Sequence, residues 1–340
     1  LSSAGRALAL RGVDLQQAAG RLGQAQLGWT VLGLLSMWLS IALRAWRWQA
    51  LLGPAAGQIG RQRLAGAYLA GLLLNALLPL RAGEFGRVAL AGRGGPAVTP
   101  PDAPPPGEPS PTGGEQHRKP SDDRQPGYLA LAGSVVVEKL LDLAVFALLA
   151  LWLTGGGSVS ETLHAPARLL IAGGLAALAA LAALVAWRKP ALGFLERRLP
   201  ARLQPLSPRL LRPGLHSLDA LAAPGRAAAV AGLSLAAWGC GLANNYLAGR
   251  ALGLPVSWEA AGLLLIVLQA GNSLPSLPAN LGVFELAAVL ALQAYGIDQT
   301  AALSYGILLR VIVYVPILLS GLPAFLLLST RAAAPGSAAP

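Results

Sequence analysis

The sequence predicts an all-α fold, a polytopic transmembrane helical bundle with inverted repeats and two re-entrant helical hairpins. Three observations lead to this prediction. Of the 340 residues, 54% are hydrophobic and only 12% are charged, whereas soluble proteins carry about 25% charged residues. Several apolar runs are long enough to cross the roughly 30 Å of bilayer hydrocarbon. Two shorter apolar runs are interrupted by asparagine and proline at corresponding places.

The N-terminal residues 1–26 form an amphipathic segment that is too polar to span a bilayer, because arginines separate its apolar positions. The uncharged run 27–43 that follows is long enough to span. A basic and aromatic group stands directly after it: Arg44, Trp46, Arg47 and Trp48. Arginine and tryptophan are typical of the lipid headgroup level, so we expect this group to anchor the span at the membrane surface.

The next apolar run, 64–80, is short and is interrupted by Asn75 and Pro79. Residues 91–127 differ in kind, because proline, glycine and charges of both signs dominate and no periodicity appears. This composition predicts a disordered linker. Two clear spans follow, at 129–153 and 167–187.

A basic segment, 188–225, follows these spans and fixes the orientation of the chain. It is rich in arginine and contains several prolines, which predicts short amphipathic pieces on the membrane surface. Basic loops are typically cytoplasmic. The linker and the C-terminus are then cytoplasmic as well, and the N-terminal arginines lie outside.

The rest of the chain contains a span, two short apolar arms and a long final helix. Their bounds are 227–250 for the span, 259–274 and 281–295 for the arms, and 300–329 for the final helix. Two prolines in the final run are expected to kink the helix, because neighbouring helices satisfy the freed backbone groups. The membrane domain therefore covers 27–330, and residues 331–340 are expected to form a disordered tail.

Two similar motifs occupy corresponding places in the halves of the chain. The first runs from Asn75 through Pro79 and Gly83 to Glu84, and the second from Asn272 through Pro275 and Gly282 to Glu285. With the orientation given above, the first enters the bilayer from inside and the second from outside. Interrupted helices at matching places of an inverted repeat indicate the central site of a transporter. The alternative is that both motifs are interfacial loops between ordinary helices.

Ionisable residues lie within two predicted spans. Glu138, Lys139 and Asp142 belong to one, and Arg310 belongs to the last. A charge at the bilayer centre costs at least roughly 2.5–3.5 kcal/mol, so we expect Arg310 to pair with Glu138 or Asp142. Such a pair either fixes helix packing without further function or lines a polar cavity between the two repeats.

The sequence after the first motif places Arg81, Glu84 and Arg87 at three-residue spacing, hence on one face of a helix. These charges either face a substrate or are solvated on an interfacial helix. The full set of expected substrate-binding residues is Asn75, Pro79, Arg81, Glu84, Arg87, Glu138, Asp142, Asn272, Pro275, Glu285 and Arg310. No metal, cofactor or catalytic residue is expected, because no nucleophile–base arrangement or metal-ligand spacing appears.

The spaced motifs resemble a known family. They are Arg44 to Trp48 with Leu51 and Leu52, Asn75 to Arg87, Glu138 to Asp142, Pro278 to Glu285, and Arg310. Together they are similar to the flippase-like transmembrane region of lysylphosphatidylglycerol synthases. The resemblance covers about 27–330 and implies translocation of lipid between leaflets. Members usually have arginine after the glutamate where this chain has Lys139, and no soluble aminoacyl-transferring domain is expected here.

These observations predict a flippase-like transporter of a polar or charged lipid in the inner (plasma) membrane of a bacterial cell. The expected partners are membrane lipids, anionic or amine-bearing phospholipids, and the formal net charge of +11 suits an anionic lipid surface. Nucleic acid is not expected, because no binding motif occurs. The alternatives are a membrane-embedded enzyme and an accessory subunit acting on lipid-linked substrates. A homo-oligomer or a complex with a lipid-modifying enzyme is compatible with either.

Overall fold

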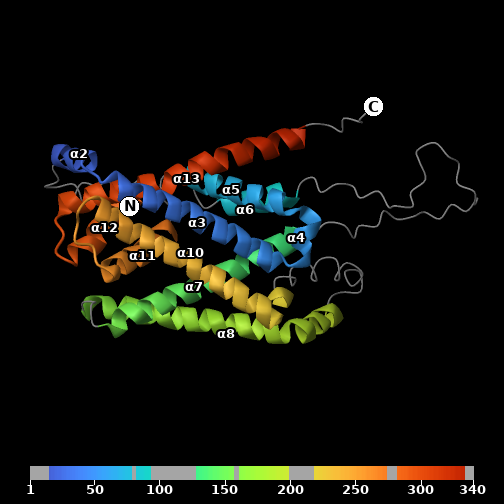
Figure 1. The fold of residues 1–340 in the computed structure, drawn as a ribbon. Helices are drawn as coiled ribbons and strands as arrows, with labels where there is room; N and C mark the ends of the chain where they lie inside the picture. Colours follow the sequence, from blue (N-terminus) through green and yellow to red (C-terminus); the bar gives the residue numbers. More distant parts are fainter. Residues whose placement is uncertain are drawn as a thin grey trace, which may run out of the picture.

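The computed structural model describes residues 15–78, 82–92, 128–156, 161–198, 218–273 and 282–333, and these residues form helices and turns without a strand. In chain order the helices are α2 (Leu15–Gly23), α3 (Leu27–Leu52), α4 (Pro54–Ile59), α5 (Arg61–Leu77), α6 (Ala82–Gly92), α7 (Tyr128–Gly155), α8 (Glu161–Arg198), α10 (Pro224–Ala251), α11 (Trp258–Ser273), α12 (Val283–Gln293) and α13 (Gln299–Ala333). The all-α prediction is confirmed (Figure 1).

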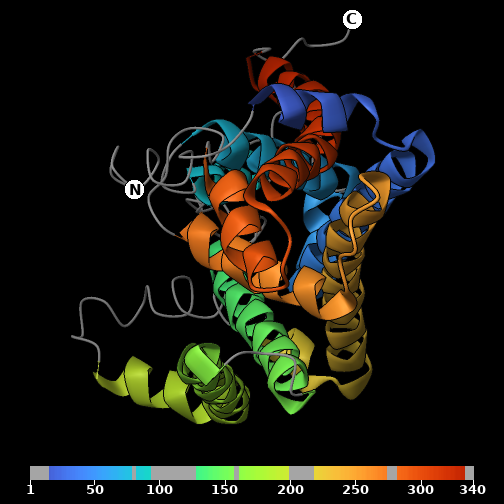
Figure 2. The same ribbon diagram turned by 90° about the vertical axis from the view of Figure 1, so that its left-hand side faces the viewer.

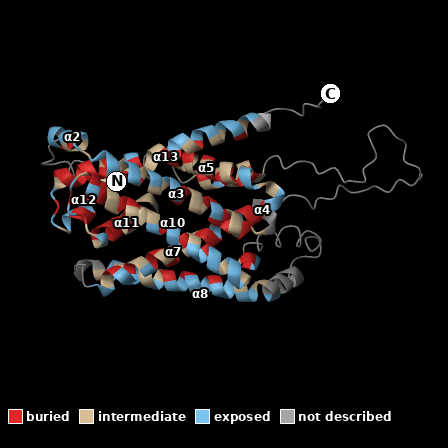
Figure 3. Cartoon of the chain, in the orientation of Figure 1, coloured by how far each residue is buried: buried red, intermediate tan, exposed pale blue. Residues whose placement is uncertain are grey.

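Four helices are long and apolar enough to cross a membrane: Leu27–Leu52, His164–Arg188, Pro224–Ala251 and Gln299–Thr330. Each contains one of the predicted spans. Helix α7, with 28 residues, is as long as these, but it carries three charged residues in its middle. Buried residues concentrate where helices meet, whereas α8 and the C-terminal half of α13 expose large apolar side chains (Figure 3). An apolar outer surface of this kind is what a lipid environment stabilises.

Helices α3 and α10 are antiparallel neighbours along their whole length. The Gln26 N–H donates to the Ala251 carbonyl at 2.8 Å, and the Ser40 hydroxyl donates to the Ala237 carbonyl at 2.9 Å. Helix α8 lies against α7 on one side of the bundle (Figure 2). A Cβ atom added to Gly174 of α8 would lie 2.1 Å from Ala147 Cβ of α7, so the two backbones approach closely because this position is glycine.

Helices α5 and α6 form an antiparallel pair that begins and ends at one end of the bundle. A Cβ atom added to Gly83 would lie 2.0 Å from the Gly71 carbonyl oxygen, and the Arg63 guanidinium donates to the Leu90 carbonyl at 3.1 Å. The contact of Gly66 with Leu328 places the start of α5 beside the end of α13.

Helices α11 and α12 form a second antiparallel pair that begins and ends at the opposite end. Asn245, near the end of α10, donates to the Ala261 carbonyl at 3.0 Å. The pair then ends at the start of α13, where Asp298 accepts a hydrogen bond from the Ala301 N–H at 2.9 Å. The first half of α13 therefore packs on α12, and its second half packs on α5.

The boundaries of the predicted polar segments are corrected in part. Residues 188–198 were expected to begin a series of short surface pieces, but they continue α8 through Pro190 to Arg198. A proline removes one backbone hydrogen bond, which a long helix tolerates. Residues 91 and 92 belong to α6 and 331–333 to α13. The remaining parts of the linker, the tail and the basic segment up to residue 217 lie outside the described residues, as do Pro79, Arg81, Pro275 and Pro278.

Candidate functional site

The centre of the candidate site is the guanidinium of Arg47, on α3. Its Nη1 atom donates to Asp142 Oδ1 at 2.6 Å, and its Nη2 atom donates to Glu138 Oε1 at 2.9 Å. Both carboxylates project from one face of α7, since they are four residues apart. The planar fork of arginine is suited to such a paired contact, which a lysine could not make. The Arg47 side chain is 0% exposed.

This arrangement corrects two predictions. Arg47 and Trp48 were expected at the membrane surface, but both are fully buried, because α3 continues to Leu52 and turns them toward α5 and α7. Only Trp46, with 57% exposure, lies on the outer surface. Arg310 was expected to pair with Glu138 or Asp142, but its Nη2 atom donates to Glu285 Oε2 at 2.6 Å instead. The ion pair between Arg310 and Glu285 joins α12 to α13.

Further hydrogen bonds hold the central carboxylates and Arg47 in place. Asp142 Oδ1 also accepts the indole N–H of Trp238, on α10, at 2.8 Å. Arg47 Nη1 donates to the Ser234 hydroxyl of the same helix at 3.1 Å. Helices α3, α7 and α10 therefore meet in one buried polar network, in which the desolvation of each charge is offset by several partners.

Arg87, on α6, extends this network. Its Nη2 atom donates to the second oxygen of Glu138 at 2.8 Å, and its guanidinium lies 5.0 Å from the Trp48 ring centroid and 5.4 Å from that of Tyr68. Arg87 is 4% exposed, so the interpretation of this face as a solvated interfacial helix is wrong for Arg87.

Glu84 and Lys139 form a separate pair with a distance of 2.7 Å between Lys139 Nζ and Glu84 Oε1, and the Lys139 side chain is 42% exposed. Lys139 thus makes a single-point contact between α7 and α6. This pair is far more accessible than the network around Arg47.

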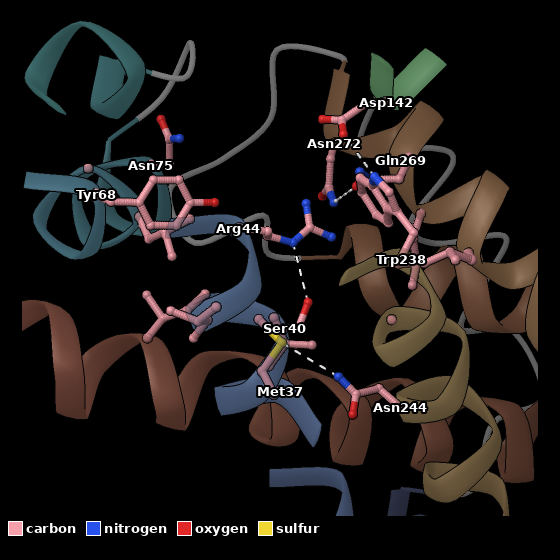
Figure 4. Close-up of a pocket in the computed structure, with 18 of the residues that line it drawn as sticks. Met37, Ser40, Arg44, Tyr68, Asn75, Asp142, Trp238, Asn244, Gln269 and Asn272 are labelled. Atoms are coloured by element: carbon pink, nitrogen blue, oxygen red, sulfur yellow. Dashed lines mark hydrogen bonds between the residues drawn. The ribbon is translucent and has the colours of Figure 1, made fainter. Parts of the chain in front are cut away.

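A cavity of about 420 Å³ lies beside the network, with walls from α3, α5, α6, α7, α10, α11, α12 and α13. Six of the predicted site residues line it: Asn75, Glu84, Arg87, Glu138, Asp142 and Asn272. Glu285 and Arg310 are not among its lining residues, although Phe284 is. Pro79, Arg81 and Pro275 lie outside the described part of the chain. Residues almost 200 positions apart, Asn75 and Asn272, thus face one space (Figure 4).

Arg44 and Trp238 are cavity residues that the sequence reasoning did not assign to the site. The Arg44 guanidinium carbon lies 3.8 Å from the Trp238 ring centroid, and Arg44 Nε donates to the Ser40 hydroxyl at 3.3 Å. Figure 4 shows Arg44 between Asn75 and Tyr68 on one side and Trp238 and Asn272 on the other. The available signal was helical spacing, because Ser40, Arg44 and Arg47 stand four and three residues apart on one face of α3.

The cavity also contains hydrogen-bonding capacity that the described residues do not use. The amide oxygens of Asn75 and Asn244 are buried and have no hydrogen-bond partner there. An unsatisfied buried acceptor costs about 1–3 kcal/mol, so these positions are suited to the hydroxyl or ammonium donors of a ligand. Among the described residues, no group of three or more His, Cys, Asp or Glu side chains could hold a metal ion.

Apolar helices of spanning length around a buried, charged cavity define an integral membrane protein. Residues 1–321 match the model of the family described as lysylphosphatidylglycerol synthase TM region. This match covers nearly the whole chain, and the chain belongs to that lipid-related family, as the sequence motifs predicted. Comparisons with curated proteins and with solved structures gave no match.

Proposed function

We propose that the protein is a transporter, not an enzyme, and that it moves a polar or charged phospholipid between the leaflets of the bacterial inner membrane. The observation that carries this proposal is the position of the cavity between the facing ends of the two helix pairs. Asn75 and Glu84 come from the α5–α6 pair, and Asn272 and Phe284 come from the α11–α12 pair. The pairs start at opposite ends of the bundle, so the cavity is central to both.

In this proposal each helix pair is a re-entrant hairpin, and the two pairs are the equivalent parts of an inverted repeat. A chain break within a bilayer is tolerated where it faces protein or a wet cavity. Asn75 and Asn272, the motif residues that precede the two interruptions, line the cavity. Helix α13 supports the proposal because it packs one half against each pair. Rocking of one repeat against the other would open the cavity to each side in turn.

The charge pattern suggests which groups exchange partners with the substrate. The Arg47–Glu138–Asp142 network is buried and would hold the helices together. The Glu84–Lys139 pair lines the cavity and is partly exposed, so a headgroup phosphate could replace Glu84 on Lys139, and a headgroup amine could replace Lys139 on Glu84. We propose that this exchange accompanies headgroup entry.

A translocation assay in proteoliposomes tests the proposed function. Fluorescent phospholipids in the outer leaflet are quenched by an impermeant reductant, and the protected fraction reports movement between leaflets. We expect Glu84→Gln to slow translocation on the order of tenfold, which corresponds to about 1.4 kcal/mol, because Lys139 would then hold a phosphate without competition. The matched control is Arg188→Gln, which breaks the peripheral pair with Asp219 and should leave the rate unchanged.

Two results would contradict the proposal. One is the absence of protein-dependent translocation for anionic, zwitterionic and amine-bearing phospholipids alike. The other is formation of a new product from labelled lipid by the pure protein, which would favour a membrane-embedded enzyme.

A further inference from the structure

We propose that one lipid occupies two adjoining spaces at once, with its phosphate beside Arg44 in the central cavity and one hydrocarbon chain in a separate apolar groove between α7, α10 and α11. This inference rests on the proposed function and deepens it, because it names the chemistry of the substrate and the place of its tail.

Among the described residues that line the cavity, Arg44 is the cation without a carboxylate partner. The carboxylates that line the cavity are Glu84, Glu138 and Asp142. Each of the three forms an ion pair with another cation: Glu84 with Lys139, Asp142 with Arg47, and Glu138 with Arg47 and Arg87. None of the ion pairs among the described residues includes Arg44.

The side chain of Arg44 is also positioned so that its terminal nitrogens can bind a ligand. Its hydrogen bond within the described part of the chain uses Nε, so the two terminal nitrogens remain for the paired contact that arginine makes with phosphate. The cation–π contact with the Trp238 ring restricts the position of the guanidinium. A cation that has no ion-pair partner in the described part of the chain, in a space surrounded by apolar helices, is stabilised when an anion enters that space.

Trp238 lies between this anion site and the groove. Its indole N–H is bound to Asp142, and Phe146 packs edge-on against its ring with centroids 4.5 Å apart. Trp238 and Leu265 line both the cavity and the groove. A molecule with its anion at Arg44 therefore has an apolar space directly beyond the tryptophan ring.

The groove has a volume of about 260 Å³ and is lined by apolar residues and glycine only, among them Phe146, Gly239 and Leu242. Side chains on its rim are exposed, with Leu148 54%, Trp152 45% and Leu235 52% accessible. The groove thus opens sideways on the outer surface of the bundle, where bilayer hydrocarbon would lie. An acyl chain is the occupant that suits both this opening and the adjacent anion site.

Three probes separate the two parts of the site in binding titrations of the purified protein in detergent, read by native mass spectrometry. Phosphatidic acid has the phosphate and the chains, diacylglycerol has the chains alone, and glycerol 3-phosphate has the phosphate alone. We expect phosphatidic acid to bind at least tenfold more tightly than either fragment. Arg44→Gln should weaken the binding of phosphatidic acid at least tenfold and leave the binding of diacylglycerol unchanged. Arg44→Lys should restore part of the lost affinity for phosphatidic acid.

Filling the groove should have the complementary effect. A Cβ atom at Gly239 meets nothing within 4 Å, so Gly239→Leu places a side chain in the groove without a backbone clash. We expect Gly239→Leu to weaken the binding of phosphatidic acid and of diacylglycerol at least fivefold and to leave the binding of glycerol 3-phosphate unchanged. The matched control is Gly232→Leu, two turns away on the same helix, where the Cβ also meets nothing within 4 Å and neither space is reached. Leu235→Trp fills the groove from its rim if Gly239→Leu does not fold.

The inference is overturned if Arg44→Gln weakens diacylglycerol as much as phosphatidic acid, or if Gly239→Leu and Leu235→Trp bind every probe as the parent protein does. These outcomes are distinct from failure of the proposed function. If the probes bind as expected but the protein moves no lipid in proteoliposomes, the result would contradict transport and still support the binding site. Translocation that neither Arg44→Gln nor Gly239→Leu alters would contradict the binding site alone.

Discussion

Arg47 joins three helices through one guanidinium. It contacts two carboxylates of α7 and a hydroxyl of α10 while belonging to α3. Removing one member of a buried charge group leaves the others without compensation, which typically costs 3–5 kcal/mol. Arg47 therefore contributes to the stability of the whole assembly around the cavity.

We expect Arg47→Met to lower the free energy of unfolding by about 3–5 kcal/mol, measured by denaturation in detergent micelles. Arg47→Lys keeps the charge but cannot donate to both carboxylates with a planar fork. Its free energy of unfolding should therefore lie between those of Arg47→Met and the parent protein. Arg188→Gln, which removes an exposed ion pair, should cost about 1 kcal/mol or less. Equal stability of Arg47→Met and the parent protein would contradict the proposed role of this residue.

At the scale of helices, glycines determine which pairs approach closely. Gly173 and Gly174 are neighbours on α8, but only Gly174 faces α7, where an added Cβ would lie 2.1 Å from Ala147 Cβ and 3.0 Å from the Leu143 carbonyl oxygen. An added Cβ at Gly173 meets nothing within 4 Å. The two positions therefore form a matched test of α7–α8 packing.

Gly174→Ala should destabilise the protein by about 1–3 kcal/mol, because a methyl group must be accommodated at a filled interface. Gly173→Ala should be neutral or stabilise by up to about 1 kcal/mol, since alanine favours the helix more than glycine does. Unfolding of both variants under the same conditions provides the comparison. A larger loss for Gly173→Ala than for Gly174→Ala would show that α8 is rotated relative to the arrangement described above.

At the scale of the whole molecule, the helices were predictable and their polar contacts were not. The expected span 227–250 is α10, and the expected arm 259–274 is α11, because long apolar runs bounded by polar residues determine helices locally. The Arg47 contact with Glu138 joins residues 91 positions apart. An arginine next to tryptophan suits both a headgroup anchor and a buried network, and only the packing of α3 against α5 and α7 distinguishes the two.

The candidate site was predictable where motifs repeat. Asn75 and Asn272 were recognised by their matching places in the two halves of the chain, and both line the cavity. Arg44 was missed because it was assigned to the headgroup anchor after the span 27–43, and Trp238 was missed because it lies in an ordinary apolar span. Each acquires its role from a contact with the other helix. The two interruptions, at 79–81 and 274–281, lie outside the described residues, so their entry into the bilayer remains a prediction.

The most direct test of the central claim is the sidedness of the two helix pairs in a sealed membrane. In a Cys240→Ala background, Gln58→Cys lies just before the α5–α6 pair, and Ala294→Cys lies at the end of the α11–α12 pair; both positions are exposed. We expect an impermeant thiol reagent to modify Gln58→Cys only from the cytoplasmic face and Ala294→Cys only from the opposite face. Modification of both cysteines from the same face would contradict entry of the two pairs from opposite sides and, with it, the proposed transport pathway.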